Sequence, residues 1–161
     1  MNDPILRDVQ FMKEALKEAL KAYEKDEVPV GAVLVFENRI IARGHNQTEL
    51  LQDATAHAEM LCLTAGASQL SNWRLTDATL YCTLEPCCMC AGALLSSRVT
   101  RLVWGAKDLR AGANGSWSDI FSQKHPMHEI EILSGVLEEE SAALLKKFFQ
   151  QKRKKAAIHE C

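Results

Sequence analysis

The segment from Ala78 to Ala106 constrains the fold of this chain more than any other. Two short apolar runs with several β-branched and aromatic residues, "ATLYCTL" (78–84) and "RLVWGA" (101–106), predict buried strands. The stretch between them, "CAGALLSS" (90–97), predicts a helix. A strand, helix, strand unit of this length is typical of parallel strands joined by a right-handed crossover. It therefore favours an α/β fold.

The rest of the chain supplies the other layers of such a fold. The apolar runs 30–36 and 39–44 predict two adjacent antiparallel strands, and apolar residues at three- and four-residue spacing predict an amphipathic helix over 8–25. Further helices are expected from near His57 onward and over 137–155. We expect a three-layer α/β/α domain, with a mixed central sheet of about five strands and helices on both faces.

Composition indicates one domain and gives no overall sign of a nucleic-acid partner. With 161 residues, 47% of them hydrophobic and 25% charged, the chain has the profile of one globular domain across residues 1–161. Its formal net charge is −2, so any nucleic-acid signal must be local. The segment "KKFFQQKRKK" (146–155) is such a signal, although a solvated basic helix end is an equal alternative.

The N-terminal segment bears on the cellular compartment. "MNDPILRDVQFMKEALKEAL" (1–20) mixes acidic and basic residues and lacks the apolar stretch of a signal peptide. No later segment reaches the roughly 18 to 20 apolar residues of a membrane span. We expect a soluble, cytoplasmic protein, in which cysteines serve metal binding, catalysis or packing more often than disulfides.

Three of the six cysteines lie in "EPCCMC" (85–90), where a disulfide, a metal site and simple packing are the competing interpretations. Cys87 and Cys90 are three residues apart, so on the first turn of a helix their sulfurs share one face. His57, about thirty residues upstream at the expected start of another helix, adds a nitrogen ligand. Two thiolates and an imidazole favour Zn²⁺ over Mg²⁺ or Ca²⁺.

Three protein ligands leave one tetrahedral position open, which is typical of catalytic rather than structural zinc sites. Glu59 lies two residues after His57 and diverges from it around a helix, so we expect a proton shuttle rather than a fourth ligand. A lone histidine is more often a packing residue, and C-x-x-C alone could be a redox pair. Together, however, H-x-E followed by P-C-x-x-C is the signature of zinc deaminases that act on nucleobases. The other four cysteines are expected to pack or lie at the surface: Cys62, Cys82, Cys88 and Cys161.

The motifs and their flanking segments resemble those of the bacterial tRNA-specific adenosine deaminases, within the cytidine-deaminase-like superfamily. The likeness runs from about residue 8 to 150. Its most specific segments are "EVPVGAVLV" (27–35), "GHN" (44–46), "TAHAEM" (55–60), "DATLYCTLEPCCMCAGALL" (77–95) and "WGAKDLRAGANGS" (104–116). The zinc motifs alone would mark only the wider superfamily, and the flanking segments narrow it.

The resemblance implies a function and a set of site residues. It implies a hydrolase that converts the wobble adenosine of a tRNA anticodon loop to inosine, as a homodimer with one Zn²⁺ per subunit. His57, Cys87 and Cys90 would bind the zinc, and Glu59 would move protons. Asn46 would hydrogen-bond the target base at the pocket floor. Asp108 would lie near the substrate nucleotide, although a loop acid capping a turn is an equal alternative.

Other functions remain open on the motifs. A deaminase of a free nucleobase such as guanine or cytosine would share the fold, the zinc and the glutamate but would not use RNA. A bifunctional riboflavin-pathway deaminase is disfavoured, because its second zinc cysteine is expected farther along the chain. A zinc-stabilised binding module without catalysis is disfavoured by the open coordination position beside Glu59.

Overall fold

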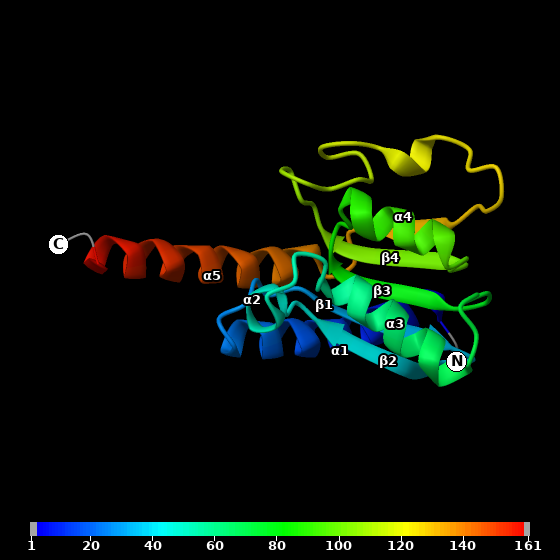
Figure 1. Ribbon diagram of the computed structural model, residues 1–161, viewed down its shortest axis with the longest axis horizontal. Helices are drawn as coiled ribbons and strands as arrows, with labels where there is room; N and C mark the ends of the chain where they lie inside the picture. Colours follow the sequence, from blue (N-terminus) through cyan, green and yellow to red (C-terminus); the bar gives the residue numbers. More distant parts are fainter. Residues whose placement is uncertain (1–2, 160–161) are drawn as a thin grey trace.

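A five-stranded mixed sheet forms the centre of the computed structural model, which describes residues 3–159 (Figure 1). Its strands are β1 (Gly31–Phe36), β2 (Arg39–His45), β3 (Thr79–Leu84), β4 (Arg101–Ala106) and β5 (Glu131–Ser134), in the order β2-β1-β3-β4-β5. β1 is antiparallel to both β2 and β3, whereas β3, β4 and β5 run parallel. The predicted antiparallel pair and the predicted parallel crossover are both confirmed.

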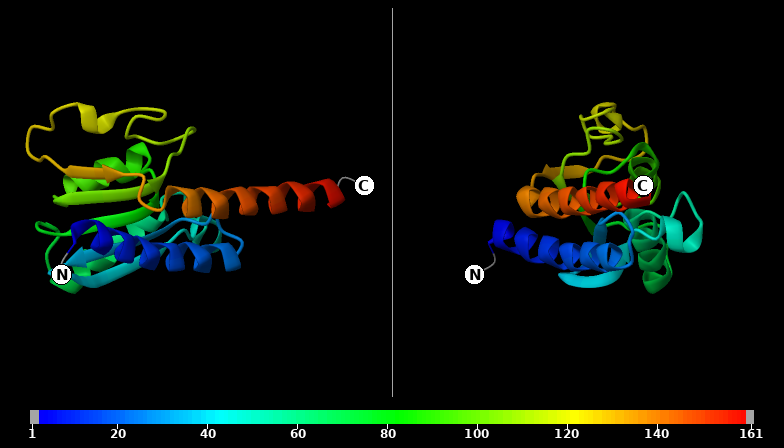
Figure 2. Two further views of the ribbon diagram at one scale, coloured as in Figure 1. Left: turned by 180° about the vertical axis from the view of Figure 1, so that it is seen from behind. Right: turned by 90° about the vertical axis from the view of Figure 1, so that its left-hand side faces the viewer.

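Helices cover both faces of this sheet, which confirms the three-layer α/β/α prediction. The helical segments are α1 (Pro4–Glu24), α2 (Thr48–Leu51), α3 (Ala58–Leu70), α4 (Cys88–Ser96), the short 3-10 helix η1 (Ile120–Ser122) and α5 (Glu138–His159). α3 and α4 lie on one face, while α1 and the first part of α5 pack on the other (Figures 1 and 2). α1 begins four residues before the predicted start, because the Asp3 side chain accepts a hydrogen bond from the Ile5 N–H and Pro4 suits a first turn.

The two layers of the core follow from the alternation of side chains along the strands. One face of the sheet buries a cluster against α1 made of Met12, Ala15, Val33, Val35, Tyr81 and Val103. The other face buries a larger cluster against α3 and α4, which includes Leu34, Cys62, Leu80, Leu94 and Leu102. Neighbouring strand residues such as Val33 and Leu34 therefore belong to opposite layers.

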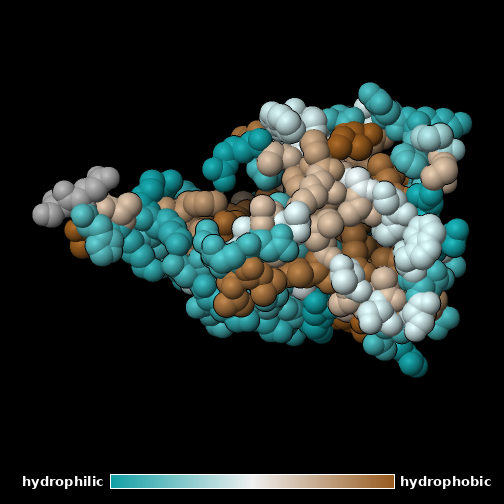
Figure 3. Space-filling view, viewed as in Figure 1, coloured by the Kyte–Doolittle hydropathy of each residue, from teal (hydrophilic) through white to brown (hydrophobic). Residues whose placement is uncertain are grey.

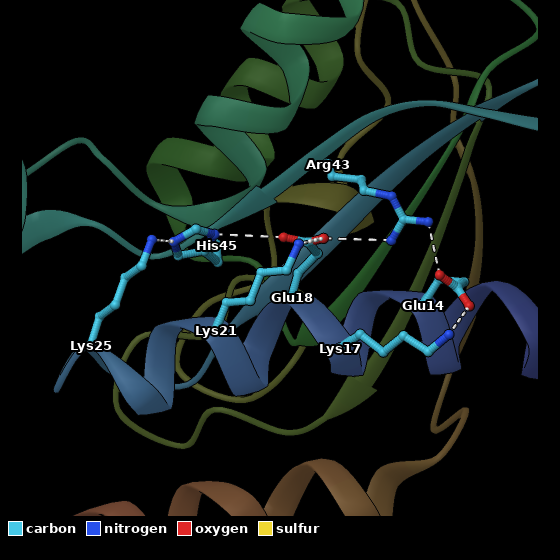
Figure 4. Close-up of polar contacts among 7 residues, drawn as sticks. All are labelled: Glu14, Lys17, Glu18, Lys21, Lys25, Arg43 and His45. Atoms are coloured by element: carbon cyan, nitrogen blue, oxygen red, sulfur yellow. Dashed lines mark hydrogen bonds and ion pairs between the residues drawn. The ribbon is translucent and has the colours of Figure 1, made fainter.

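A buried carboxylate joins α1 to the end of β2. Glu18 is only 2% exposed, and it forms ion pairs with Lys21 (2.8 Å) and Arg43 (3.5 Å) and lies 3.6 Å from the His45 ring. Figure 4 shows these side chains converging on Glu18, with Lys25 reaching His45 from the end of the same helix. Burial and the nearby Lys25 lower the pKa of His45, which favours the neutral ring. The network holds the strand end that leads directly into Asn46.

Close packing at Gly44 places α3 against the same strand end. A Cβ atom on Gly44 would lie 2.5 Å from the Ala58 carbonyl oxygen, so only glycine lets the helix approach this closely. The first turn of α3 is thereby fixed beside the last residues of β2. This places His57 and Asn46 at one edge of the sheet.

α5 extends well beyond the sheet (Figure 2). Ser141 and Phe148 are its buried residues, and the described residues after Phe149 are exposed. The helix ends at His159 rather than near the predicted Lys155. Within residues 3–159 we find no helix with the length and apolar content needed to cross a membrane.

Candidate active site and metal centre

The three predicted zinc ligands meet where two helices begin. His57 is the residue that caps the N-terminus of α3, and Cys87 caps that of α4, both with extended backbone. Cys90 follows in the first turn of α4 and is fully buried. The positive ends of two helix dipoles therefore face this point, which favours thiolate over thiol. The predicted placement of the ligands at helix starts is confirmed.

Their spacing fits a tetrahedral zinc ion. His57 Nδ1 lies 3.6 Å from the sulfur of Cys87 and 3.6 Å from the sulfur of Cys90, and the three ligand atoms lie within 4.8 Å of one another. With Zn–S near 2.3 Å and Zn–N near 2.0 to 2.1 Å, tetrahedral angles place nitrogen and sulfur about 3.6 Å apart. The residues present therefore match the size of the ion as well as its preference for sulfur and nitrogen.

The pKa shifts of His57, Cys87 and Cys90 also indicate a metal site. A hydrogen bond with Cys90 lowers the pKa of the Cys87 thiol to about 4, and the same contact raises that of Cys90. The contact with Cys87 also raises the pKa of His57. One thiolate is thus stabilised by its two neighbours, and a divalent cation between the same atoms would stabilise both thiolates.

Glu59 lies next to the ligands without being one of them. It is 4% exposed in the first turn of α3, and the cluster of ligand atoms found in the described part of the chain consists of His57, Cys87 and Cys90. Burial raises the pKa of Glu59 above the ordinary carboxyl range. A raised pKa makes the carboxylate a better proton acceptor, and a general base that later returns the proton as an acid needs this property.

A cavity of about 880 Å³ opens in front of these residues, within the size range of small-molecule sites. His57, Glu59 and Cys87 line its inner part, together with Asn46. Its walls come from the start of α2, the segment after β4 and the middle of α5. The wall residues include Thr48, Glu49, Lys107, Asp108, Arg110, Lys146, Phe149 and Arg153.

Asn46 combines a structural contact with a place in the cavity. Its side-chain oxygen accepts a hydrogen bond of 2.9 Å from the Ala58 N–H, so it satisfies a free donor at the start of α3. This contact fixes the orientation of the amide, since only the oxygen can accept from an N–H. The NH₂ group is left as a donor for a molecule in the cavity.

Asp108 lies where it can fill either of its two predicted roles, capping a turn or contacting the substrate nucleotide. Its carboxylate accepts hydrogen bonds from the N–H groups of Arg110 (3.1 Å) and Ala111 (3.3 Å), which is the turn-capping alternative. The same residue lines the cavity and is partly exposed. The structure therefore places Asp108 at the cavity wall, while its side chain shapes the turn.

Among the described residues, Cys62, Cys82 and Cys88 do not belong to the ligand cluster, as predicted. Cys62 and Cys82 are buried in the core, and burial raises the pKa of both thiols. Cys88 points elsewhere on α4, with its sulfur 3.1 Å from the Ser118 hydroxyl oxygen. Cys161 lies outside the described residues.

Sequence reasoning missed two buried carboxylates that shape the cavity. Glu27 accepts hydrogen bonds from the N–H groups of Glu49 (3.2 Å) and Leu50 (2.7 Å) and so caps the short helix α2. Glu85 is 1% exposed directly before Pro86 and Cys87. Its place inside the zinc motif was the available signal, because an acidic residue next to metal ligands needs either a partner or a function.

Comparisons with known proteins agree with this site. Residues 6–106 match the family model described as cytidine and deoxycytidylate deaminase zinc-binding region. The tRNA-specific adenosine deaminase of Bacillus subtilis is 52% identical over 133 residues, which cover 83% of each protein. The chloroplastic tRNA(adenine(34)) deaminase of Arabidopsis thaliana is 53% identical over 147 residues, or 81% of this chain but only 11% of that much longer protein.

Solved structures place the chain in the same group. A structure from a study of A-to-I editing by tRNA:A34 deaminases superposes with a TM-score of 0.80 at 47% sequence identity, covering 84% of this chain and 98% of the other. The fold, the cluster of His57, Cys87 and Cys90, and these identities agree with one another. The chain therefore belongs to the tRNA-specific adenosine deaminases, a family built on the cytidine and deoxycytidylate deaminase zinc-binding region.

Proposed function

We propose that this protein converts adenosine to inosine at the wobble position of a tRNA anticodon loop by zinc-dependent hydrolysis, with release of ammonia. The observation that carries the proposal is the trio His57, Cys87 and Cys90 at zinc-ligand spacing, beside the buried Glu59 in one cavity. Membership of the tRNA-specific adenosine deaminases supports the choice of substrate. The proposed catalytic unit is a single domain across residues 1–161.

The metal centre supplies the nucleophile. His57, Cys87 and Cys90 are the proposed ligands, because their ligand atoms have the separations that tetrahedral zinc requires. Zinc held by them would lower the pKa of a water molecule from about 15.7 towards 7, so that hydroxide is available at neutral pH. The open side of the ligand cluster faces the cavity, where the base would lie.

Glu59 is the proposed proton carrier. Its carboxylate accepts a proton from the attacking water and passes it to ring N1 of adenine, which makes C6 electrophilic. It then helps to protonate the amino group that leaves as ammonia, so water and adenosine give inosine and ammonia. The raised pKa of this buried carboxyl supports the assignment, because a group that alternates between acid and base works best near the operating pH.

Asn46 and Asp108 are proposed to orient the substrate. The Asn46 amide is held by the Ala58 N–H, so its NH₂ group can donate to a ring nitrogen of the base without reorganisation. Asp108 contributes from the cavity rim, where its carboxylate already organises the turn at Arg110 and Ala111. Neither residue belongs to the metal cluster, so we assign both to substrate binding.

Basic side chains on the cavity wall suit a polynucleotide better than a free base. Beside six acidic residues (Asp26, Glu27, Glu49, Glu59, Glu85 and Asp108), five basic residues line the cavity, namely Lys107, Arg110, Lys146, Lys152 and Arg153. A free base carries no phosphate to use them, whereas an RNA backbone does. An anticodon loop also presents its bases unstacked, which lowers the cost of placing one in a pocket.

The basic segment 146–155 of α5 contributes to this wall only in part. Lys152 pairs with Asp26 at 2.9 Å, and Lys155 lies 3.8 Å from the same carboxylate. Lys146 and Arg153 line the cavity together with Phe148 and Phe149, and Phe148 is otherwise buried, with its ring edge-on to that of Tyr23. We propose that Lys146 and Arg153 contact RNA phosphates and that Lys152 mainly fixes the helix.

A homodimer is proposed as the working assembly, in a cytoplasmic setting where tRNA is found. Leu50 and Leu51 on α2 are 61% and 51% exposed, next to Thr48 and Glu49 on the cavity wall. Figure 3 shows apolar residues at the surface beside α2, whereas hydrophilic residues follow α5. Burial of these leucines against a second copy would remove apolar surface from water. Sedimentation of the wild type and of Leu50→Ser checks this, because the variant should shift towards monomer.

An ammonia-release assay with matched substrates tests the proposed function. The purified protein would be incubated with an anticodon stem-loop containing a wobble adenosine, with free adenine, guanine and cytosine, and with the stem-loop after chelation of zinc. We expect ammonia from the untreated stem-loop alone. Release from a free base and none from RNA would instead support the free-base deaminase, and no release from any substrate would support a binding module.

A further inference from the structure

Glu85 is a buried acidic residue to which the reaction assigns no step. It follows the last residue of β3 and immediately precedes Pro86 and Cys87, and it is only 1% exposed. A carboxylate at this depth needs several hydrogen bonds to offset the loss of water. Its partners all belong to the segment 107–116 that follows β4.

Four donors from that segment surround the two carboxylate oxygens. Asn114 and Ser116 donate their N–H groups to Oε2, at 2.9 and 3.3 Å. The N–H of Asp108 (3.4 Å) and the hydroxyl of Ser116 donate to Oε1. The carboxylate is thus the centre around which the segment folds.

Gly112 shows how tightly the segment is wrapped. A Cβ atom there would lie 2.2 Å from Glu85 Oε2 and 2.6 Å from the Asp108 carbonyl oxygen, so any larger residue would displace the carboxylate or the chain. Gly112 also pairs with Cys87 in a short antiparallel bridge, and the Ala113 N–H donates to the Pro86 carbonyl oxygen at 2.8 Å. The segment is therefore fastened directly to the residues that carry the metal ligands.

The same segment forms a wall of the cavity. Lys107, Asp108, Leu109, Arg110 and Ala111 line it, opposite α5. Leu109 is 77% exposed and does not anchor this wall, whereas Arg110 lies over the Phe149 ring and Asn114 accepts a hydrogen bond from Trp104. The hydrogen bonds to the Glu85 carboxylate join both ends of the segment, at Asp108 and Ser116, to the residue next to Pro86 and Cys87.

We infer that Glu85 is a positioning residue: its carboxylate holds the 107–116 wall in register with the metal centre and so sets where the substrate strand lies. This inference rests on the proposed function for its substrate. Glu85 takes no part in proton transfer and binds no metal. Its loss affects the placement of RNA more than the chemical step.

Glu85→Gln is the informative variant, because it keeps size and shape but replaces one acceptor oxygen with an NH₂ donor. That donor must face the N–H or O–H groups that now bond to the carboxylate, so one side of the segment detaches. Asp8→Asn is the matched control, since Asp8 is an equally buried carboxylate (2% exposed) paired with Arg101 at the opposite end of β4. Ser116→Ala removes the hydroxyl donor to Oε1 and keeps the Ser116 N–H bond to Oε2, and it serves as the second variant if Glu85→Gln does not fold.

Three readouts are needed: zinc content, KM and kcat on an anticodon stem-loop, and amide hydrogen exchange. We expect Glu85→Gln to retain zinc, to raise KM about tenfold with a smaller change in kcat, and to speed exchange at Asp108, Asn114 and Ser116. Ser116→Ala should change the same quantities in the same direction by less. Asp8→Asn should lower the melting temperature and leave KM and the exchange of these amides unchanged.

The outcomes separate this inference from the proposed function. If the wild-type protein shows no activity on RNA, the proposed function is wrong. Amide hydrogen exchange would still decide whether Glu85 holds the segment 107–116 in place. Loss of zinc in Glu85→Gln, or a lower melting temperature with unchanged KM and unchanged exchange at the three amides, would overturn the positioning role. The residue would then be a support for the ligand segment or a general stabilising group.

Discussion

The two ends of the parallel strands bury carboxylates in opposite ways. At the amino end of β4, Asp8 accepts two hydrogen bonds from Arg101, at 2.7 and 2.8 Å, and one from the Tyr81 hydroxyl. Burial by itself would raise the pKa of Asp8, but these donors outweigh it and the pKa is lowered. At the carboxyl end, beside the metal ligands, burial dominates at Glu59 and its pKa is raised.

The difference separates a group that holds structure from a group available for chemistry. Asp8 stays ionised because a guanidinium compensates its charge, and its proton affinity is too low for it to serve as an acid. At Glu59, burial outweighs the contacts with its own backbone, His57 and Cys82 that lower the pKa, so proton binding is favoured where a substrate can reach it. Variants at the two ends should therefore fail in different ways.

The largest effect is expected at the carboxyl end, from Glu59→Gln. Turnover of the stem-loop should fall by about 10³-fold or more, because the only proposed proton carrier is lost while the metal ligands are untouched. Zinc analysis and an inosine assay on the same sample check this. A near wild-type rate would remove Glu59 from the mechanism, and a loss of zinc would make it a structural residue.

Replacing a ligand should damage both stability and activity. Cys87→Ala or Cys90→Ala removes a contact between two helix starts and the ion, so zinc content, melting temperature and turnover should fall together. Cys88→Ala is the matched control, since its sulfur contacts Ser118 instead. Equal loss of zinc in Cys88→Ala would contradict the ligand assignment.

At the amino end, Asp8→Ala should cost about 3 to 5 kcal/mol of stability, because Arg101 loses its buried partner and keeps only the exposed Glu131. Denaturant unfolding of both proteins measures this. The pKa of Asp8 is lowered in the folded state, so its contribution is fully present above the ordinary pKa of about 3.9 and is lost as the pH falls below it. The difference in free energy of unfolding between wild type and variant should therefore become smaller below about pH 4. A difference that does not change with pH would argue against the ion pair.

Asn46→Ala should have a smaller effect on the reaction, and it should also lower stability modestly because the Ala58 N–H loses its acceptor. The amide contacts one base, whereas affinity for RNA is spread over many phosphates, so kcat should fall about 10- to 100-fold with little change in binding. Single-turnover rates and equilibrium binding of a stem-loop separate the two quantities. If only the affinity for RNA falls, Asn46 does not contact the reacting base, and its role is to cap α3 through the Ala58 N–H.

The smallest effect is expected from a chain stopped after Gln151. Arg153 is then lost from the cavity wall and Lys152 from its pair with Asp26, while zinc and the sheet are kept. RNA binding should weaken, and the slope of log affinity against log salt should flatten by about 0.7 to 0.9 for each phosphate contact removed. Equal salt slopes in the two proteins would mean that this end of α5 makes no phosphate contact and is a solvated helix end.

The sequence carried enough information for four strands, including the edge strand β2, but not for β5 at the other edge. The strands at 78–84 and 101–106 are buried and apolar, so their pattern was visible, whereas in β5 only Ile132 is partly buried and the other residues are exposed, so β5 gave no signal. The helix α2 was missed for a similar reason, since it is four residues long and depends on Glu27 from another segment to cap it.

The site was predictable where local spacing decides geometry. His57, Cys87 and Cys90 could be grouped because each lies at a helix start, and the structure brings them together. Spacing alone could not predict the walls, because the 107–116 segment and α5 reach the cavity through long-range packing. Asp108 was expected there only from the family resemblance, and the basic segment 146–155 only as a local charge signal. Glu85 was visible in the motif, but its four donors lie 23 to 31 residues downstream.

The central claim is that this cavity deaminates one adenosine in a tRNA anticodon loop. The most direct measurement is to incubate the wild type and Glu59→Gln with total bacterial tRNA and to sequence the reverse transcripts for A-to-G changes. We predict a change confined to the wobble position with the wild type and none with the variant. Changes spread along many RNAs, changes that persist in Glu59→Gln, or no change with zinc-loaded wild type would contradict the account.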